Sequence, residues 1–387
     1  MNIQSYTKEV ELREYCWNTD SWNRNDLKTS RNHTDLLGAY LYTPEETLQE
    51  FQRQHKQKIH RRDQPCAVEP PSGRAVLQRV GGKAYYGFLF QLCGGTSLLA
   101  LSRSPAGRLR ELLGKPGMLL MAGCHDAISA KQVEWAGFSA TFMSGFAVAA
   151  TRLGLPDTGL ISYAELVDQG RSICQAVNIP VFGDGDTGFG NAINVKRTVQ
   201  GYAQAGFACI MLEDQVSPKR CGHTQGKAVV GREEALSRIK AAVDARDAGA
   251  DILIMARTDA RATHGLEEAI ERCRLFRDIG ADISFLEAPE SRDEMRRYCE
   301  AVEGPKMVNL IEQGKTPLLP LNELETLGYH IAVHPLTLLN ASICAMREAL
   351  VSLQAGQQPQ NLLGFEELKT AVGFPEYYAE EQRYLPD

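Results

Sequence analysis

The chain has 387 residues, of which 43% are hydrophobic and 23% are charged, and its formal net charge is -6. This composition is that of an ordinary globular protein and excludes a chain that is disordered throughout. Because lysine and arginine are scattered and the net charge is negative, we expect neither nucleic acid nor a membrane surface as the main partner.

The first part of the chain, residues 1–104, shows no sustained helical or strand period and predicts a poorly ordered N-terminal extension. Its apolar stretch 84–92 predicts a short surface strand or helix, because a membrane span needs ~18 residues. Acidic residues such as Glu9, Glu11 and Glu14 argue against a transit peptide. We therefore expect a cytoplasmic protein, with an organelle matrix as the alternative if this extension is a transit segment.

Residues 105–387 predict one catalytic domain, in which short apolar runs alternate with helix-like stretches. Continuously apolar runs are typical of parallel strands whose sheet is covered by helices. Eight such units predict an α/β fold of the closed (β/α)8 barrel type, with an open doubly wound sheet as the alternative. The runs are residues 118–121, 140–143, 180–183, 209–212, 252–255, 283–286, 307–310 and 330–333.

Three of the helix-like stretches end at a glycine. They are residues 192–205 before Gly206, residues 232–248 before Gly249, and residues 266–279 before Gly280. Glycine is favoured at this position because the backbone there adopts a left-handed conformation. The spacing therefore predicts helices that stop at these three points.

Acidic residues follow the third and fourth runs, at the strand ends where barrels of this kind carry their active sites. Asp184 and Asp186 come after the third run and Glu213 after the fourth. Neighbouring carboxylates repel one another unless they are protonated or bridged by a cation, and oxygen ligands with water suit Mg²⁺. We predict a metal site of Asp184 and Asp186, with Glu213 reaching it through water, and with Mn²⁺ as the alternative ion.

Two other interpretations apply to these acidic residues. They can cap helices or hold turns, an alternative that is weaker for the Asp184 and Asp186 pair than for Asp214 and Asp259. Residues 183–188 also match the G-x-G-x-x-G dinucleotide pattern. We set this match aside, because two carboxylates in the loop would oppose a pyrophosphate.

Several of the ten cysteines lie in apolar runs and are expected to be reduced and buried. Cys221 instead follows Lys219 and Arg220 and precedes His223 in a polar segment. Cationic neighbours lower the pKa of a thiol, which predicts a proton donor or acceptor at this position. A zinc site fits this segment poorly, because one Cys and one His lack the further ligands that structural zinc requires.

Arg257 follows an apolar run, where an unpaired guanidinium is costly to bury. It therefore needs a carboxylate partner, either Glu287 after the sixth run or the substrate. Ser144 and Gly145 close the second run, and they predict a hydroxyl and exposed N–H groups for a substrate carboxylate.

Six segments resemble, in order and spacing, the motifs of the isocitrate lyase/phosphoenolpyruvate mutase superfamily. They are residues 142–145, 155–157, 184–190, 212–215, 219–223 and 256–260. The resemblance covers about residues 105 to 350. Its Lys-Arg-Cys-Gly-His segment is typical of the carbon–carbon lyase branch, which includes 2-methylisocitrate lyase. Residues 309–317 look like the petal death protein and carboxyvinyl-carboxyphosphonate phosphorylmutase group.

The resemblance implies a Mg²⁺-dependent barrel that forms a homotetramer and exchanges its last helix between neighbouring subunits. It implies Cys221 as the general acid, with further catalytic roles for Lys219, His223, Arg257 and Glu287. The residues implied in substrate binding are Ser144, Gly145, Asp157, Gly222, Asn309 and Thr337.

The reaction implied is retro-aldol cleavage of a small 2-hydroxy di- or tricarboxylate, of the 2-methylisocitrate or 2-alkylmalate type. A base removes the hydroxyl proton, Arg257 and Lys219 stabilise the departing fragment, and Cys221 protonates it. The enzymatic alternatives are an oxaloacetate hydrolase or decarboxylase and a carboxyvinyl-carboxyphosphonate phosphorylmutase. The alternative outside enzymes is a non-catalytic oligomeric barrel.

Overall fold

The computed structural model describes residues 7–9, 73–80, 83–90, 104–222 and 226–385. The chain divides into two compact units, Met1–Arg103 and Ser104–Asp387. In the first unit an antiparallel sheet has the order β1-β2-β3, with β1 Thr7–Glu9, β2 Gly73–Val80 and β3 Lys83–Phe90. Most of the apolar stretch 84–92 is thus a strand. The prediction that residues 1–104 are poorly ordered otherwise concerns residues outside the described ranges.

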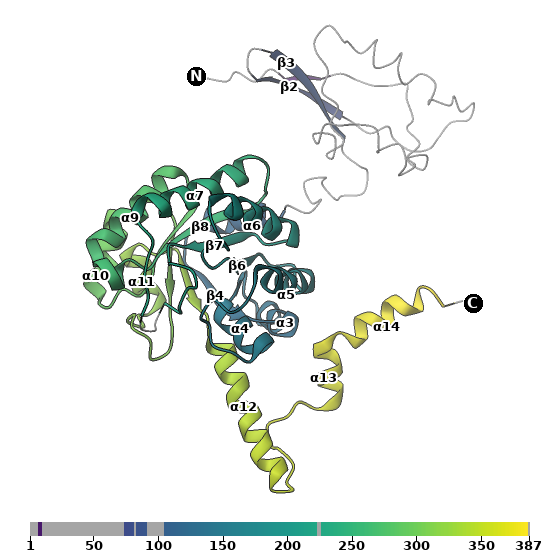
Figure 1. Ribbon diagram of the computed structural model, residues 1–387. Coiled ribbons are helices and arrows are strands. Elements are labelled where there is room, and N and C mark those ends of the chain that lie inside the picture. The colour runs from purple at the N-terminus through teal and green to yellow at the C-terminus, as the bar shows by residue number, and fades with distance from the viewer. Residues whose placement is uncertain (1–6, 10–72, 81–82, 91–103, 223–225, 386–387) are drawn as a thin grey trace, which may run out of the picture. The chain divides into compact units, whose positions relative to one another are not determined.

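The second unit is built around a closed barrel of eight parallel strands (Figure 1). Neighbouring strands follow one another along the chain, and β11 pairs with β4 to close the barrel. Each apolar run of the sequence coincides with one strand, so the predicted (β/α)8 barrel is confirmed and the open sheet is excluded. The strands are β4 Leu119–Cys124, β5 Thr141–Met143, β6 Val181–Asp184, β7 Cys209–Glu213, β8 Leu253–Thr258, β9 Ile283–Leu286, β10 Lys306–Asn309 and β11 Ile331–His334.

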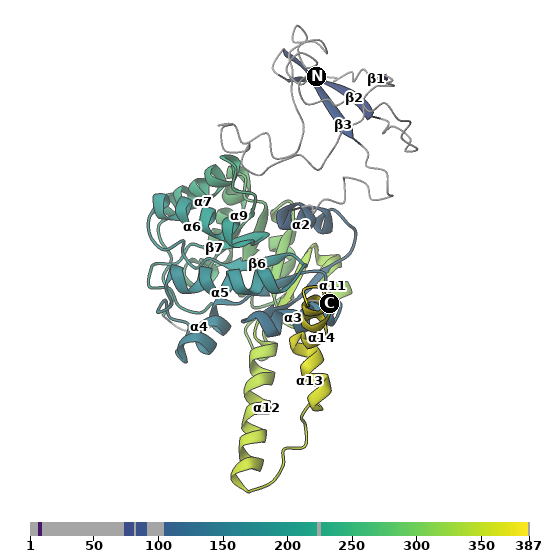
Figure 2. The same cartoon turned by 90° about the vertical axis from the view of Figure 1, so that its right-hand side faces the viewer.

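Helices surround the barrel (Figures 1 and 2). They are α2 Pro105–Leu113, α3 Ala127–Trp135, α4 Gly145–Leu153, α5 Tyr163–Ala176, α6 Ala192–Ala205, α7 Arg232–Asp247, α8 Arg261–His264, α9 Leu266–Ile279, α10 Arg292–Ala301 and α11 Leu321–Leu327. α6 and α9 end as predicted at Gly206 and Gly280, whose φ angles are 104° and 111°. α7 stops one residue earlier than predicted, with Ala248 as its C-cap.

Three further helices follow the last strand: α12 Thr337–Gln354, α13 Phe365–Val372 and α14 Phe374–Gln382. α12 projects away from the barrel in both ribbon views (Figures 1 and 2). Large apolar side chains lie exposed on these helices, among them Leu350, Val351 and Phe365 at 63%, 68% and 74% exposure. The C-terminal helices therefore present an apolar surface that the described residues do not cover.

Side chains of the strands alternate between two layers of the core. Phe182, Met211 and Met255 belong to a cluster to which all eight strands contribute, which places it inside the barrel. Their neighbours Ile210 and Ile254 pack instead in the layer between strands and helices. Because successive side chains of a strand point to opposite faces, the residue two positions after an inward apolar side chain also faces inward. This alternation decides which polar residues reach the mouth of the barrel.

None of the helices in the described residues has the length and apolar character of a membrane span.

The cysteines of the described residues mostly agree with the expectation of buried, reduced thiols. The described cysteines form no disulfide with one another, and Cys124, Cys209, Cys273 and Cys299 are buried as expected. Cys344 departs from that expectation, because it lies on the exposed helix α12.

Candidate active site

Five polar side chains continue the inward-facing rows of five neighbouring strands, β6 to β10. Each lies two residues after an inward apolar side chain: Asp184 after Phe182, Glu213 after Met211, Arg257 after Met255, Glu287 after Phe285 and Asn309 after Met307. Since parallel strands end at the same rim, these side chains meet at the carboxyl end of the barrel. Strand alternation alone therefore brings these five predicted site residues to the same end of the barrel.

Three carboxylates and one ammonium group form a carboxylate cluster at this rim. Lys219 Nζ lies 2.7 Å from Asp157 Oδ1 and 2.9 Å from Asp186 Oδ1. Asp184 accepts hydrogen bonds from the N–H of Asp186 at 3.0 Å and of Gly145 at 3.2 Å. The four charged side chains are only 4–7% exposed. The cluster is thus buried and carries more carboxylates than cations.

Burial changes the proton affinity of these groups. Desolvation raises the pKa of Asp186 to about 7, and the nearby ammonium of Lys219 opposes this rise. Burial by itself would lower the pKa of Lys219, but the surrounding carboxylates hold it well above its usual range. Desolvation also raises the pKa of Glu213 well above its usual range, against the effect of Arg257. Carboxylates in this state are stabilised in their ionised form by an added cation.

The donor atoms of the cluster fit a hard divalent cation. Glu213 Oε1 is buried and accepts no hydrogen bond from the described residues, and the buried Asp186 Oδ1 has Lys219 Nζ beside it at 2.9 Å. No group of three or more His, Cys, Asp or Glu side chains forms a metal cage within the described ranges. Mg²⁺ does not need one, because it keeps several waters and uses one or two carboxylates. Asp184 and Asp186 are the residues that could hold it.

A second group, the arginine cluster, surrounds Arg257. Its Nε lies 2.8 Å from Asp259 Oδ2 and 3.3 Å from Glu213 Oε2, and its Nη1 lies 3.2 Å from Glu287 Oε2. Asn309 donates a hydrogen bond to Glu287 at 3.1 Å. The expected partner Glu287 is present, and Asp259 is a nearer partner that the sequence did not indicate.

The segment that carries Cys221 joins the two clusters. Lys219 belongs to the carboxylate cluster, while Gly222 packs against the arginine cluster. A Cβ atom added to Gly222 would lie 2.4 Å from Arg257 Nη2 and 2.7 Å from Glu287 Cγ, so a larger residue does not fit there. Cys221 between them is partly exposed, and the predicted site residue that follows Gly222 is His223, which lies outside the described residues. The backbone that carries Cys221 therefore runs from the carboxylate cluster to the arginine cluster.

Ser144 and Gly145 differ from the expectation in their backbone N–H groups. The N–H of Ser144 donates to the carbonyl of Cys124 at 3.1 Å, and the N–H of Gly145 donates to Asp184. The expectation of exposed N–H groups is wrong, because the end of β5 closes on β4 and on the carboxylate cluster. The Ser144 hydroxyl caps α4 by accepting from the N–H of Ala147.

Thr337 lies at the first residue of α12. Its hydroxyl donates a hydrogen bond to Glu312, whose Oε1 lies 3.6 Å from His334 Nδ1. This hydrogen bond joins Thr337 to a residue outside both clusters. Its role in substrate binding stays a prediction.

Two buried side chains support the arginine cluster: that of Asp214, for which the sequence allowed a turn-holding role, and that of Lys227, which the sequence did not indicate. Asp214 accepts hydrogen bonds from the Thr258 hydroxyl at 2.6 Å and from the N–H of Asp259 at 2.9 Å, so it holds the turn after β8. Lys227 Nζ lies 3.0 Å from Asp259 Oδ1. Both contacts join segments far apart in the chain, and spacing within one segment does not reveal them.

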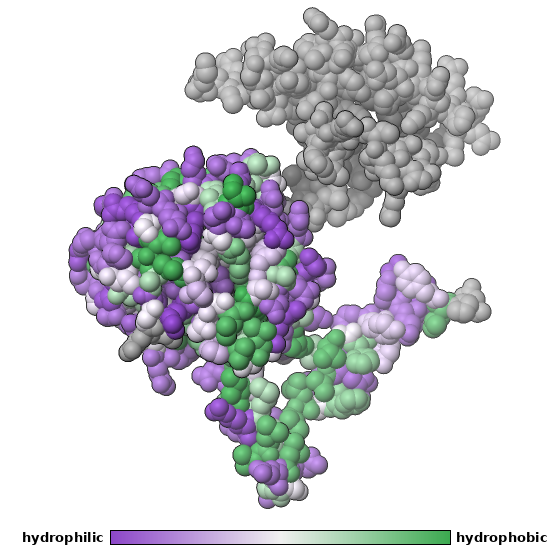
Figure 3. All heavy atoms as spheres, in the orientation of Figure 1, coloured by the Kyte–Doolittle hydropathy of each residue, from purple (hydrophilic) through white to green (hydrophobic). Residues whose placement is uncertain are grey.

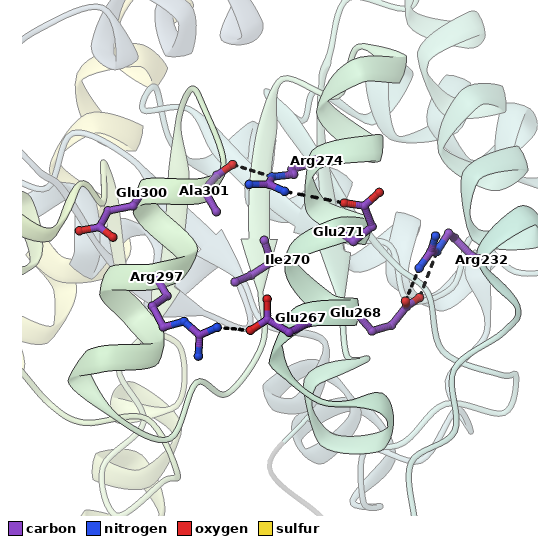
Figure 4. A pocket seen from close by; sticks show the side chains of 9 residues that line it. All are labelled: Arg232, Glu267, Glu268, Ile270, Glu271, Arg274, Arg297, Glu300 and Ala301. Atoms are coloured by element: carbon purple, nitrogen blue, oxygen red, sulfur yellow. Dashed lines mark hydrogen bonds and ion pairs between the residues drawn. The ribbon is translucent and has the colours of Figure 1, made fainter.

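Another charged region is a groove of about 600 Å³ on the outer surface, lined by α9, α10 and one residue of α7 (Figure 4). Its arginines are paired: Arg232 with Glu268, and Arg297 with Glu267. Arg274 donates to the backbone carbonyl of residue 301 at 2.9 Å. Because these charges neutralise one another in contact with water, the groove is a weaker candidate site than the barrel mouth.

Comparisons with known proteins match this geometry. The family described as phosphoenolpyruvate phosphomutase matches residues 109–354. The chain is 48% identical over 248 residues to 2,3-dimethylmalate lyase of Eubacterium barkeri, which covers 64% of this chain and 84% of that protein. The solved structure of oxaloacetate acetylhydrolase with the inhibitor 3,3-difluorooxalacetate has a TM-score of 0.70 and 35% identity, and covers 72% of this chain and 96% of that chain.

The solved structure of phosphonopyruvate hydrolase in complex with oxalate and Mg²⁺ is also similar to this chain, with a TM-score of 0.66 and 27% identity. The match covers 73% of this chain and 100% of the hydrolase chain. The matched residues 109–354 contain all eight barrel strands and both clusters. The resemblance of the motifs is thus confirmed over the whole barrel. The chain belongs to the phosphoenolpyruvate mutase/isocitrate lyase superfamily of (β/α)8-barrel enzymes.

Proposed function

We propose that this chain is a Mg²⁺-dependent carbon–carbon lyase. It cleaves a small 2-hydroxy di- or tricarboxylate, of the 2-methylisocitrate or 2-alkylmalate type, to a 2-oxo acid and a carboxylate. The observation that carries the proposal is segment 219–222, which holds Cys221 between the carboxylate cluster and the arginine cluster. The similarity to 2,3-dimethylmalate lyase supports a substrate of this class.

Asp184 and Asp186 would hold the Mg²⁺, and Glu213 would reach it through water, with Mn²⁺ as the alternative ion. When bound, the ion supplies chelation of the substrate hydroxyl and carboxylate, which lowers the pKa of the hydroxyl. The buried carboxylate oxygens of Asp186 and Glu213 support this role. So does the similarity to a hydrolase whose structure contains Mg²⁺ and oxalate.

Cleavage begins when the 2-hydroxyl proton passes to a base of the carboxylate cluster. The bond between the hydroxyl-bearing carbon and its neighbour then breaks, and the first carbon becomes the carbonyl of the 2-oxo acid. The electron pair stays on the second fragment, next to a carboxylate whose charge Arg257 and Lys219 stabilise. The Cys221 thiol donates the proton that completes this product. Positioning of the substrate is assigned to Ser144, Gly145, Asp157, Gly222, His223, Glu287, Asn309 and Thr337.

A second candidate is hydrolysis or decarboxylation of oxaloacetate by the same residues. The structural similarity to oxaloacetate acetylhydrolase favours it. Both reactions need a cation beside the 2-oxygen and a stabilised anionic fragment, so they place the same demands on the two clusters.

A substrate panel tests the proposal. The protein is incubated with Mg²⁺ and, separately, with 2-alkylmalates, 2-methylisocitrate, isocitrate, oxaloacetate and phosphonopyruvate, and the products are separated by chromatography. Release of pyruvate or glyoxylate from the hydroxy acids supports the lyase. Oxalate from oxaloacetate supports the hydrolase, and phosphoenolpyruvate from phosphonopyruvate supports a mutase. Failure of every compound, together with no Mg²⁺ uptake by calorimetry, would leave a non-catalytic barrel.

We propose that the protein is a homotetramer that exchanges a C-terminal helix between subunits. Apolar side chains gather over α12 and α13 (Figure 3), where Phe365 is 74% and Leu350 63% exposed. Exposed apolar patches of this kind are typical of subunit interfaces. Light scattering should give four times the chain mass of 42.7 kDa, and a monomer at micromolar concentration would contradict the proposal.

We also propose that residues 105–387 are a catalytic domain that works without residues 1–104. The protein would lie in the cytoplasm, or in an organelle matrix if residues 1–104 act as a transit segment. A chain of residues 105–387 should keep full activity, and fluorescent fusions with and without residues 1–104 should show whether that part directs import.

A further inference from the structure

Two buried side chains hold the residues on either side of Cys221. Before the thiol, Gln215 Oε1 accepts from the N–H of Arg220 at 2.9 Å, and its Nε2 donates to the Arg220 carbonyl at 2.8 Å. After the thiol, Lys227 Nζ donates to the carbonyl of Gly222. The backbone is therefore tied down immediately before and immediately after the thiol.

Gln215 is itself held in place. It is 1% exposed, its backbone bridges to Val229, and its carbonyl accepts from Arg238 Nη1 at 3.1 Å. Its amide carries both N–H donors and an acceptor oxygen, so it binds both backbone groups of Arg220 as a neighbouring strand would. Leucine offers neither group and an ionised glutamate offers no donor, so neither can replace it.

Lys227 links the thiol segment to the arginine cluster. Its side chain is 3% exposed, and its Nζ lies 3.0 Å from Asp259 Oδ1. Asp259 in turn accepts from Arg257 Nε at 2.8 Å and from Nη2 at 3.1 Å. One ammonium group thus contacts both the carbonyl beside the thiol and the carboxylate that orients the guanidinium. It sets the position of Cys221 relative to Arg257.

We propose that Gln215 and Lys227 are positioning residues that hold the Cys221 thiol for proton transfer. This inference rests on the proposed lyase function. Proton transfer requires the donor within hydrogen-bond distance of the carbon it protonates, and a displacement of about 1 Å costs on the order of a hundredfold in rate. Lys227→Met and Gln215→Leu should therefore lower kcat about a hundredfold, while KM and the affinity for Mg²⁺ stay close to those of the wild type.

Lys306→Met is the matched control. Lys306 is also a buried lysine, and its Nζ donates to the carbonyls of Val302 at 2.8 Å and Gly304 at 2.7 Å. It begins β10, so it lies at the opposite end of the barrel from the candidate site. The control should lower the melting temperature as Lys227→Met does and leave kcat unchanged.

The reactivity of Cys221 tests the inference without any substrate. Alkylation by iodoacetamide, at the same reagent concentration for every protein, is followed by mass spectrometry of the Cys221 peptide. Lys227→Met and Gln215→Leu should change the alkylation rate at Cys221 several-fold relative to the wild type, and Lys306→Met should not. This change in a protein that turns over no panel compound would uphold the positioning and reject the lyase.

Equal Cys221 rates in the wild type and in both folded variants would overturn the inference, as would kcat values within about twofold of the wild type, because misplacement is expected to cost about a hundredfold. If Gln215→Leu fails to fold, Gln215→Glu replaces it, and if Lys227→Met fails to fold, the Gln215 variant decides the result. Gln215→Glu keeps the acceptor for the N–H of Arg220 but places an oxygen against its carbonyl, and the same two outcomes decide the result.

Discussion

Charged side chains gather both at the mouth of the barrel and in the groove between α9 and α10, but the two regions differ in burial. At the mouth, Asp186, Lys219 and Arg257 are 4–7% exposed. In the groove, the side chains of Arg297 and Glu267 are 44% and 76% exposed. Exposed pairs contribute little and satisfy one another in water, whereas buried charges depend on every partner they have. Burial with incomplete partners, rather than density of charge, therefore distinguishes the candidate site.

The largest effect is expected from the carboxylate cluster. Asp186→Asn keeps the size of the side chain but removes a charge from the pair that would hold Mg²⁺. Loss of the ion should lower kcat/KM at least about a thousandfold, since a bound cation contributes several kcal/mol to the transition state. Calorimetry should show no Mg²⁺ uptake. The groove variant Glu267→Gln makes the same chemical change outside the site and should retain both properties.

Cys221→Ser separates the proton donor from the metal site. The serine hydroxyl is a much weaker acid than a thiol, so kcat should fall about 10²- to 10⁴-fold. Mg²⁺ affinity should stay at the wild-type value, because the carboxylate cluster is unchanged. Full activity of this variant in the substrate panel would remove Cys221 from the mechanism.

Arg257→Met compares the two regions through stability rather than activity. It leaves Asp259, Glu213 and Glu287 buried without their shared guanidinium, which should cost about 3–5 kcal/mol in the free energy of unfolding. Arg297→Met in the groove removes an exposed pair and should cost no more than about 1 kcal/mol. Urea unfolding measures both, and equal losses would contradict the distinction between buried and exposed charges.

The smallest expected effect is the pH dependence of the stability that Glu268 contributes in the groove. The hydrogen bond from Arg232, followed by the one from Arg272, lowers the pKa of Glu268 to about 2 from 4.5. Its contribution to stability is therefore present above pH 4.5 and is lost as the pH falls towards 2. Glu268→Gln should cost about 1 kcal/mol at pH 7. Urea unfolding at a series of pH values should show the difference from the wild type shrinking below pH 4.5, and a constant difference would contradict it.

The fold could be predicted closely from local patterns in the sequence. Each of the eight apolar runs is a strand, because parallel strands covered by helices are buried on both faces. α6 and α9 have the predicted bounds, since their C-caps Gly206 and Gly280 adopt the left-handed conformation that glycine permits. The predicted end of α7 is one residue too late, because Ala248, with φ -80° and ψ 2°, is already its C-cap and the left-handed Gly249, with φ 114°, follows the cap.

The candidate site could be predicted from the sequence only in part. Asp184, Glu213, Arg257 and Glu287 were indicated because each ends an apolar run, and strand alternation brings them together. The exposed N–H groups expected at Ser144 were wrong, because the partner that accepts its N–H is on another strand.

The sequence by itself determined the barrel, the carboxylates at its mouth and the thiol segment, because strand period, helix caps and motif spacing are properties of neighbouring residues. Only the tertiary structure decided that Asp259 is the nearest partner of Arg257, and that Gln215 and Lys227 hold the backbone on either side of Cys221. These contacts are made by side chains brought together by the closure of the barrel. Their strength comes from the exclusion of water at that place, which no local pattern of the chain encodes.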